Sequence, residues 1–246
     1  MSESPPNVGR VIRTALIVLP FGTILLGALS FVFYFNKQEK VLQRSIKYAA
    51  GLRKDLNEAD LKHYESIVTE ASSKPGDERT KSLAAFVEST LGPENMGYEV
   101  RTLADPANPQ SAALALDVEL TGTKRPNDVV LVLCDYLGAD TARATACLLG
   151  CAHSLTGTPL IRSIRFTAVQ NVSALKHYQT FAVSPQDRFT HVVLLGNAAS
   201  ATDAEITGPL HLQQRGTVIL RPELKGDLLT AAQALLKQLN DLADRL

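Results

Sequence analysis

The pattern of apolar and polar residues divides the chain into three parts. Residues 14–35 form an uncharged apolar run, residues 36–72 place apolar residues at helical spacing among charges, and residues 73–246 alternate short apolar runs with helical segments. A run of 22 uncharged residues, at ~1.5 Å per residue, is long enough to cross a hydrocarbon core of ~30 Å. We therefore predict a short tail over 1–13, one transmembrane helix over 14–35, a helical stalk over 36–72 and one globular domain over 73–246.

The apolar run is typical of a retained signal anchor rather than of a cleaved signal peptide. TALIVLPFGTILLGALSFVFYF is longer than the apolar core of a signal peptide, and the bulky FVFYF follows Ser30, where cleavage would require small residues. We expect Phe33, Tyr34 and Phe35 to lie at the membrane interface. Basic residues flank both ends of the run in similar numbers, so charge alone leaves the orientation undecided.

After Gly92 and Pro93, which end a helical pattern that begins near Asp77, six β-like runs alternate with further helical patterns. The runs begin at Tyr98, Ala113, Val129, Ile161, Thr190 and Thr217. Helical patterns separate several of them, over 140–155, 175–181 and 226–246. This alternation predicts an α/β fold, a three-layer αβα sandwich with a mixed, largely parallel sheet. VVLVLC, which is apolar at every position, is the predicted central strand because both of its faces would be covered by helices.

The last helical pattern carries one continuous apolar seam. Its members recur at steps of four and three, and they are Leu228, Ala232, Leu235, Leu239, Leu242 and Leu246. Such a stripe most often covers a sheet. The other interpretation is that the seam pairs with another subunit.

Charge and cysteine content exclude two classes of protein. Twenty-five basic residues balance twenty-five acidic ones, so no overall field gathers nucleic acid, and we expect no nucleic-acid partner. Cys134, Cys147 and Cys151 are an odd number within a short stretch, which argues against a disulfide framework. They lack CxxC spacing and basic neighbours, so we predict that they are small buried hydrophobic residues.

Four phrases in a fixed order carry a more specific signal. The chain reads AAFVESTLGPENMGYEV, then LDVELTGTKRPNDVVLVLCDY, then GADTARATACLLGCAHSL, then RSIRFTAV. In this order the phrases, which fall within residues 55–175, resemble metallopeptidase family 28. That family comprises zinc aminopeptidases and relatives such as glutaminyl cyclase and the transferrin receptor ectodomain. The resemblance implies a shortened aminopeptidase-like α/β domain whose site lies after the central strand.

The resemblance also implies zinc ligands that this sequence lacks. Where the family has His-Tyr-Asp, the chain has Asp135 and Tyr136 followed by an apolar residue. The family then has two adjacent acidic residues, of which this chain keeps only Asp140. The family's Glu-Glu positions hold Val172 and Ser173. A dinuclear zinc site needs about four or five N and O donors at ~2.0–2.2 Å. We therefore interpret Asp135, Tyr136 and Asp140 as vestigial positions and predict no catalytic residue, no metal ligand and no cofactor.

Three functional hypotheses follow. The first is a membrane-anchored, catalytically inactive, aminopeptidase-like domain that acts as a binding or assembly module, with residues 14–35 in the lipid bilayer and a protein partner. The second is a divergent metal-dependent aminopeptidase that holds zinc through Asp135, Asp140 and either His191 or His211. The third is a structural tether in a membrane complex, in which the stalk and the last helix pair with other subunits.

We predict from the resemblance, rather than from charge, on which side of the membrane the domain lies. Members of the family generally work outside the cytoplasm, and long domains translocate largely regardless of their charge. We therefore expect a single-pass membrane protein with an extracytoplasmic domain.

Overall fold

A computed structural model describes residues 48, 51–108, 111–138, 141–210, 212 and 216–244, and for residues 179–182 only the backbone. The described residues from Tyr48 onward form one compact unit. The predicted tail, the transmembrane helix over 14–35 and the first part of the stalk lie outside the described residues. Within the part that is described, no helix is both long enough and apolar enough to cross a membrane.

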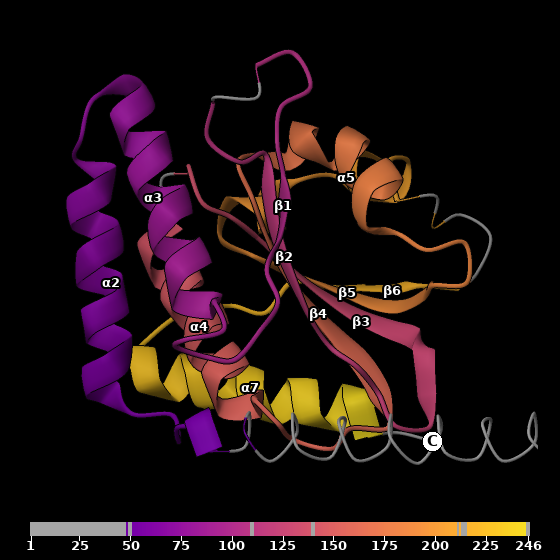
Figure 1. The fold of residues 1–246 in the computed structure, drawn as a ribbon. Helices are drawn as coiled ribbons and strands as arrows, with labels where there is room; N and C mark the ends of the chain where they lie inside the picture. The colour runs from indigo at the N-terminus through magenta and orange to yellow at the C-terminus, as the bar shows by residue number, and fades with distance from the viewer. Residues whose placement is uncertain are drawn as a thin grey trace, which may run out of the picture. The chain divides into compact units, whose positions relative to one another are not determined.

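The centre of the unit is a six-stranded sheet with the order β1-β2-β4-β3-β5-β6 (Figure 1). The strands are β1 (Arg101–Leu103), β2 (Ala115–Leu120), β3 (Arg125–Asp135), β4 (Arg162–Val169), β5 (Arg188–Leu195) and β6 (Val218–Leu220). β4, β3, β5 and β6 are parallel to one another, whereas β2 is antiparallel to both β1 and β4. The sheet is therefore mixed and mostly parallel, as the alternation of elements predicted.

Helices cover both faces of this sheet and complete three layers (Figure 1). One face carries α2 (Glu58–Ser72), α3 (Gly76–Leu91), α4 (Thr141–Leu155) and α7 (Leu228–Asp244). The other carries α5 (Leu175–Ala182) and α6 (Asp203–Thr207). Two short 3-10 helices follow β4 and β5, namely η1 (Val172–Ala174) and η2 (Gly196–Ser200). This arrangement fits the αβα sandwich expected from the sequence.

The central strand β3 is buried on both faces. Val130 and Val132 pack in the cluster under α4, whereas Leu131 and Leu133 pack in the cluster under α5. Successive side chains of a strand point to opposite faces, so a run without polar residues suits a strand covered on both sides. The prediction that VVLVLC is the central strand is confirmed, since β3 lies between β4 and β5.

α2 belongs to the domain, although the sequence pattern assigned it to the stalk. Its Leu61, Tyr64 and Val68 are buried in the same cluster as α4. Gly150 of α4 permits this close packing, because a Cβ at that position would lie 2.6 Å from Leu61 Cδ2. The compact unit thus begins well before residue 73, where the sequence placed the start of the domain.

The apolar seam of α7 faces the interior of its own domain. The seam residues within the described part are buried in the cluster under α4, and they are Leu228, Ala232, Leu235, Leu239 and Leu242. α7 contacts α4 and β4. The seam therefore covers the sheet and is not available to the partner subunit that the tether hypothesis assigned to it.

Candidate functional site at the carboxyl edge of the sheet

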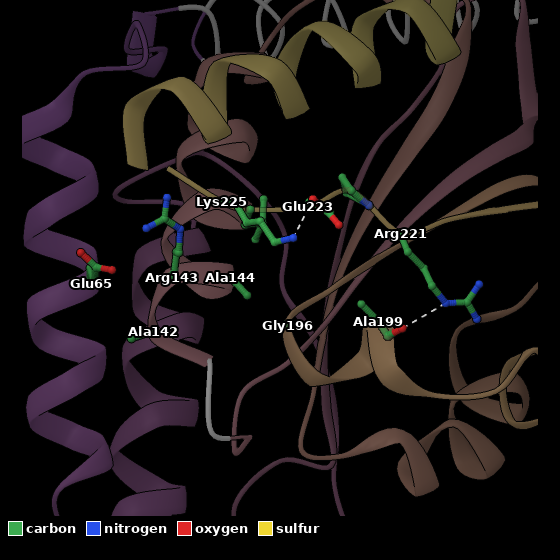
Figure 2. Close-up of a pocket in the computed structure, with 11 residues that line it drawn as sticks. Glu65, Ala142, Arg143, Ala144, Gly196, Ala199, Arg221, Glu223 and Lys225 are labelled. Atoms are coloured by element: carbon green, nitrogen blue, oxygen red, sulfur yellow. Dashed lines mark hydrogen bonds and ion pairs between the residues drawn. The ribbon is translucent and has the colours of Figure 1, made fainter. Parts of the chain in front are cut away.

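The parallel strands end at one edge of the sheet, where two connections leave in opposite directions. The connection after β3 enters α4 on one face, whereas the connection after β5 enters η2 and then α6, which packs on the other face. Open α/β sheets bind ligands at such switch points, outside the carboxyl ends of the strands. A cleft of about 710 Å³ opens there, bounded by the first turn of α4, by η2 and by residues 221–225 after β6 (Figure 2).

Side chains of both charges line the cleft (Figure 2). The cationic residues are Arg143, Arg221 and Lys225, and the anionic ones are Glu65 and Glu223. Lys225 Nζ lies 3.0 Å from Glu223 Oε2, and both side chains are largely exposed. Exposed pairs of this kind are worth ~0–1 kcal/mol, so a ligand could replace either partner at small cost.

The loop that forms one wall of the cleft is held at both ends by arginine side chains. At its start, Arg221 Nε donates a hydrogen bond to Ala199 O at 3.0 Å. At its end, Arg143 Nη2 of α4 donates to Gly226 O at 2.6 Å. The wall is therefore fixed to η2 on one side and to α4 on the other.

Asp135, the first of the vestigial positions, ends β3 as a buried residue rather than as an open ligand. Its Oδ1 accepts a hydrogen bond from Ala198 N–H at 3.0 Å. Burial raises the pKa of the Asp135 carboxyl group, and hydrogen bonds from the amides of Ala198 and Asn197 oppose this rise. The carboxylate therefore satisfies N–H groups at the start of η2, which have no partner within that helix.

The second oxygen of this carboxylate is covered by the turn that follows β3. A Cβ added at Gly138 would overlap Asp135 Oδ2 and would lie 2.7 Å from Asn197 Cγ. Arg79 Nη2 of α3 fixes the same turn by donating to Leu137 O at 2.7 Å. Gly138 and Asn197 therefore crowd one side of this oxygen.

Tyr136, the second vestigial position, is a structural residue. Its side chain is fully buried, and its hydroxyl group donates a hydrogen bond to Ala113 O. Its backbone N–H donates to Val169 O at 2.8 Å, which continues the pairing of β3 with β4. Burial raises the pKa of the Tyr136 phenol, so the hydroxyl group stays neutral at physiological pH.

The positions of the family's glutamate pair form η1 and carry no carboxylate. Asn171 caps this short helix, because its Oδ1 accepts hydrogen bonds from Ala174 N–H at 3.2 Å and from the Ser173 hydroxyl group. Val172 is partly buried against the cluster under α5. A general base must lie within hydrogen-bond reach of the water that it activates, and neither Val172 nor Ser173 can serve.

His191 lies too far along the sheet to join Asp135. It pairs in register with Val130, five residues before Asp135 on the neighbouring strand. At ~3.3 Å per residue, the two positions are separated by about 16 Å. The version of the zinc hypothesis that combines Asp135 with His191 is therefore wrong. Asp140 and His211 lie outside the described residues.

Among the residues that the structure describes, no three or more His, Cys, Asp or Glu side chains are grouped so that they could hold a metal ion. The three cysteines are free and buried. Cys151 Sγ lies 3.6 Å from Ala232 O, and burial raises the pKa of the Cys147 thiol to about 12. Thiols in this environment are protonated and unreactive at neutral pH. The prediction that the cysteines are buried hydrophobic residues is confirmed.

A buried ionic cluster on the α5 side was missed from the sequence. Asp117 of β2 accepts hydrogen bonds from Thr167 Oγ1 at 2.6 Å, from Tyr178 OH at 2.9 Å and from the Arg101 guanidinium group. Asp117 itself is fully buried. Burial raises the pKa of the Asp117 carboxyl group, and the charges of Arg101 and Arg165 and the two hydroxyl donors oppose this rise.

The same cluster continues through Arg165 of β4, whose side chain is only 3% exposed. Its Nη2 lies 2.6 Å from Glu119 Oε2 and 3.0 Å from Asp187 Oδ2, and its guanidinium group lies over the Phe189 ring. The sequence did contain a signal, since Asp117 and Glu119 occupy alternate positions of a run that otherwise reads as buried strand. The buried side chains of this cluster bond mainly to one another, so we interpret it as a structural element.

No protein-family model matches the chain, and no curated protein sequence matches it. Several solved structures are similar at low identity. LapA from Legionella pneumophila is 11% identical over 80% of this chain and 63% of its own, with a TM-score of 0.42. A candidate zinc-dependent exopeptidase from Bacteroides vulgatus is 10% identical over 78% of this chain and 97% of its own, with a TM-score of 0.48.

The zinc aminopeptidase BSAP from Bacillus subtilis is 14% identical over 56% of this chain and 52% of its own, with a TM-score of 0.41. This chain therefore spans about half the length of BSAP. At these identities and scores the comparison assigns neither a family nor an activity to this chain. The solved structures that it resembles include zinc aminopeptidases and glutaminyl cyclases.

Proposed function

We propose that the domain is a non-catalytic binding module, a pseudoenzyme that receives its ligand in the cleft at the carboxyl edge of the sheet. The observation that carries the proposal is the environment of Asp135. One oxygen is bonded to the amide of Ala198, and the turn at Gly138 covers the other. Metal-assisted hydrolysis needs a bound metal ion with an open position and a base beside its water. Among the described residues, Val172 and Ser173 after β4 offer no carboxylate as such a base, which supports the proposal.

Short peptides with free ends match the cleft. Its volume of about 710 Å³ lies within the range of ~300–1,000 Å³ typical of ligand sites. Charged side chains of both signs can pair with the ammonium and carboxylate ends of such a ligand, and Ala142, Ala199 and Leu224 add apolar surface. The lining therefore supports a zwitterionic ligand better than a purely apolar one.

A tryptophan placed in the cleft tests ligand binding. The chain has no tryptophan, so the emission of a Leu224→Trp variant reports on the cleft without background. We would titrate the full chain with a mixture of unblocked tripeptides and expect a saturable change in emission. A Val218→Trp variant is the matched control, since Val218 is exposed on β6 and does not line the cleft. Equal, unsaturable responses from the two variants would contradict the proposal.

The second candidate function is a divergent metal-dependent aminopeptidase, favoured by the position of the cleft beside the end of β3. This function requires zinc held through Asp140. We expect the full chain with added zinc to leave aminoacyl p-nitroanilides uncleaved, and the Asp140→Ala variant to take up as little zinc as the wild type. Turnover that Asp140→Ala abolishes would establish the peptidase and overturn the binding module.

We also propose that residues 14–35 anchor this module in a bilayer with the domain outside the cytoplasm. The support is the length of the uncharged run. Because the three native cysteines are buried, a Lys62→Cys variant presents one exposed thiol on α2. A membrane-impermeant maleimide should label this thiol on intact cells. Labelling only after lysis would place the domain in the cytoplasm.

A further inference from the structure

α4 carries a notch that receives the chain segment leading into α2, residues 51–57. Gly150 forms the floor of the notch, since a Cβ there would lie 2.9 Å from Leu56 Cδ1. One turn further along α4, Ser154 Oγ donates a hydrogen bond to Lys54 O at 3.1 Å. The segment is therefore docked by apolar contact at one point and by a hydrogen bond to its backbone at another.

His153 makes the third contact through both nitrogens of its ring. Its Nε2 lies 3.0 Å from Leu52 O, and a carbonyl oxygen only accepts, so Nε2 carries the proton. Its Nδ1 lies 3.2 Å from Tyr64 OH, and in the neutral ring this nitrogen accepts from that hydroxyl group. The ring is 6% exposed and adjoins a cavity of about 10 Å³, room for about one water molecule.

The charged groups around this ring come from two elements. The docked segment contributes Lys54 and Asp55, and α2 contributes Asp60 and the Tyr64 phenol. Lys54 Nζ lies 4.0 Å from Asp60 Oδ2, so these two charges largely offset each other at the ring. Burial lowers the pKa of His153, and the positive charge of Lys54 lowers it further. The hydrogen bond to Leu52 O and the negative charge of Asp60 raise the pKa and so oppose this effect.

We propose that His153 is a proton-sensitive latch that holds residues 51–57 against α4 while its ring is neutral and releases them when the ring is protonated. Protonation puts a second N–H on the ring at Nδ1, facing the Tyr64 hydroxyl group, and brings a positive charge into a site almost closed to water. In the released state the ring is solvated and takes up its proton near its ordinary pKa of ~6.5.

The direction of the effect follows from linkage. The docked state binds the proton less readily than the released state, so docking is strongest above pH ~6.5 and weakens as the pH falls below that value. Residues 51–57 connect the domain to the chain that precedes it. The latch therefore makes that connection firm at neutral pH and loose at acidic pH, independently of any ligand in the cleft.

Thiol labelling tests the latch in the full chain. The buried native cysteines leave a low background, so a Leu56→Cys variant reports on release of the segment. Dividing its maleimide labelling rate by that of Lys62→Cys, whose side chain is exposed, cancels the dependence of thiol chemistry on pH. We expect this ratio to rise at least about threefold between about pH 7.5 and about pH 5.5, since the ordinary pKa of ~6.5 of a solvated ring lies inside this interval.

Two second-site variants separate the latch from a general loosening of the fold. His153→Gln keeps one donor and one acceptor but does not titrate, so the labelling ratio should become independent of pH. His63→Gln, on the exposed side of α2, should leave the pH dependence unchanged. An unchanged ratio in the Leu56→Cys chain, or a pH dependence that survives in His153→Gln, would overturn the proposal.

The Leu56→Cys substitution could itself release residues 51–57, so a second measurement uses the wild-type chain. The ring signals of the histidines in the wild-type chain can be followed by NMR as the pH falls. We expect the His153 ring to titrate below the ordinary pKa of ~6.5. A midpoint at or above ~6.5 would show that docking does not depend on a neutral ring.

Discussion

Asp117 and Asp135 are both buried carboxylates on strands of one sheet, yet different donors hold them. Asp117 is held by side chains, among them the Thr167 hydroxyl group and the Arg101 guanidinium group. Asp135 is held by backbone amides, among them the N–H of Ala198 at the start of η2. The comparison teaches that an acidic residue at the end of a central strand need not be a metal ligand. One of its oxygens can instead hold the start of the next element, as Oδ1 of Asp135 does.

The two environments also predict different costs of substitution. The partners of Asp117 include the buried Thr167 and Tyr178 hydroxyl groups, and a buried donor that loses its acceptor is expensive. Asp117 also pairs with the Arg101 guanidinium group, whereas the described partner of Asp135 is the backbone amide of Ala198. Substitutions in the two regions should therefore differ in size.

The largest expected effect is that of Asp117→Ala. Removing this carboxylate leaves the buried Thr167 and Tyr178 hydroxyl groups without their acceptor, at a cost of ~1–3 kcal/mol for each group in the free energy of unfolding. Urea denaturation measures it. Asp203→Ala is the control, because that carboxylate is exposed in its pair with Arg221 and should contribute only ~0–1 kcal/mol. Equal losses in the two variants would remove the distinction between buried and exposed pairs.

A smaller loss is expected when the turn over Asp135 is crowded. The methyl group of Gly138→Ala would meet both Asp135 and Asn197, which overpacks the turn at a cost of ~1–3 kcal/mol. Gly51→Ala is the matched control, since a Cβ there would have no neighbour within 4 Å. Thermal unfolding of both variants measures the difference. A Gly138→Ala chain as stable as its control would mean that the turn leaves room beside the carboxylate.

The smallest effect concerns pH. The pKa of Asp135 is raised in the folded chain, so its contribution to stability is fully present below the ordinary pKa of ~3.9 and is lost as the pH rises through the folded value. Asp135→Asn cannot ionise. We therefore expect the stability of the wild type, relative to this variant, to fall as the pH rises above ~4 in urea titrations. A relative stability that rises instead would indicate a lowered pKa, as a bound cation would cause.

The fold was predictable where a segment's own pattern decides its environment. β3 could be identified because a strand without polar residues needs cover on both faces. α4 and α7 could be identified because their apolar residues recur at helical spacing. The extent of the domain was less accessible, because the burial of α2 depends on the absence of a side chain at Gly150, more than 80 residues along the chain.

The candidate site was predictable in position but not in detail. The sequence placed Asp135 and Tyr136 at the end of the central strand, where they lie. It gave no sign that Asp135 holds η2, because the donor is the backbone N–H of Ala198, 63 residues later, and a backbone donor is common to nearly every residue type. The cleft depends on Arg143 and Arg221 fixing a loop between them, a tertiary arrangement without a local motif.

Zinc titration of the full chain by calorimetry, followed by metal analysis after dialysis, tests the central claim most directly. With the oxygens of Asp135 engaged by η2 and by the turn at Gly138, we expect no stoichiometric zinc to be retained. Retention of one or two equivalents by the wild type, and its loss in Asp135→Asn, would show that the carboxyl edge is a working metal site and would contradict the account.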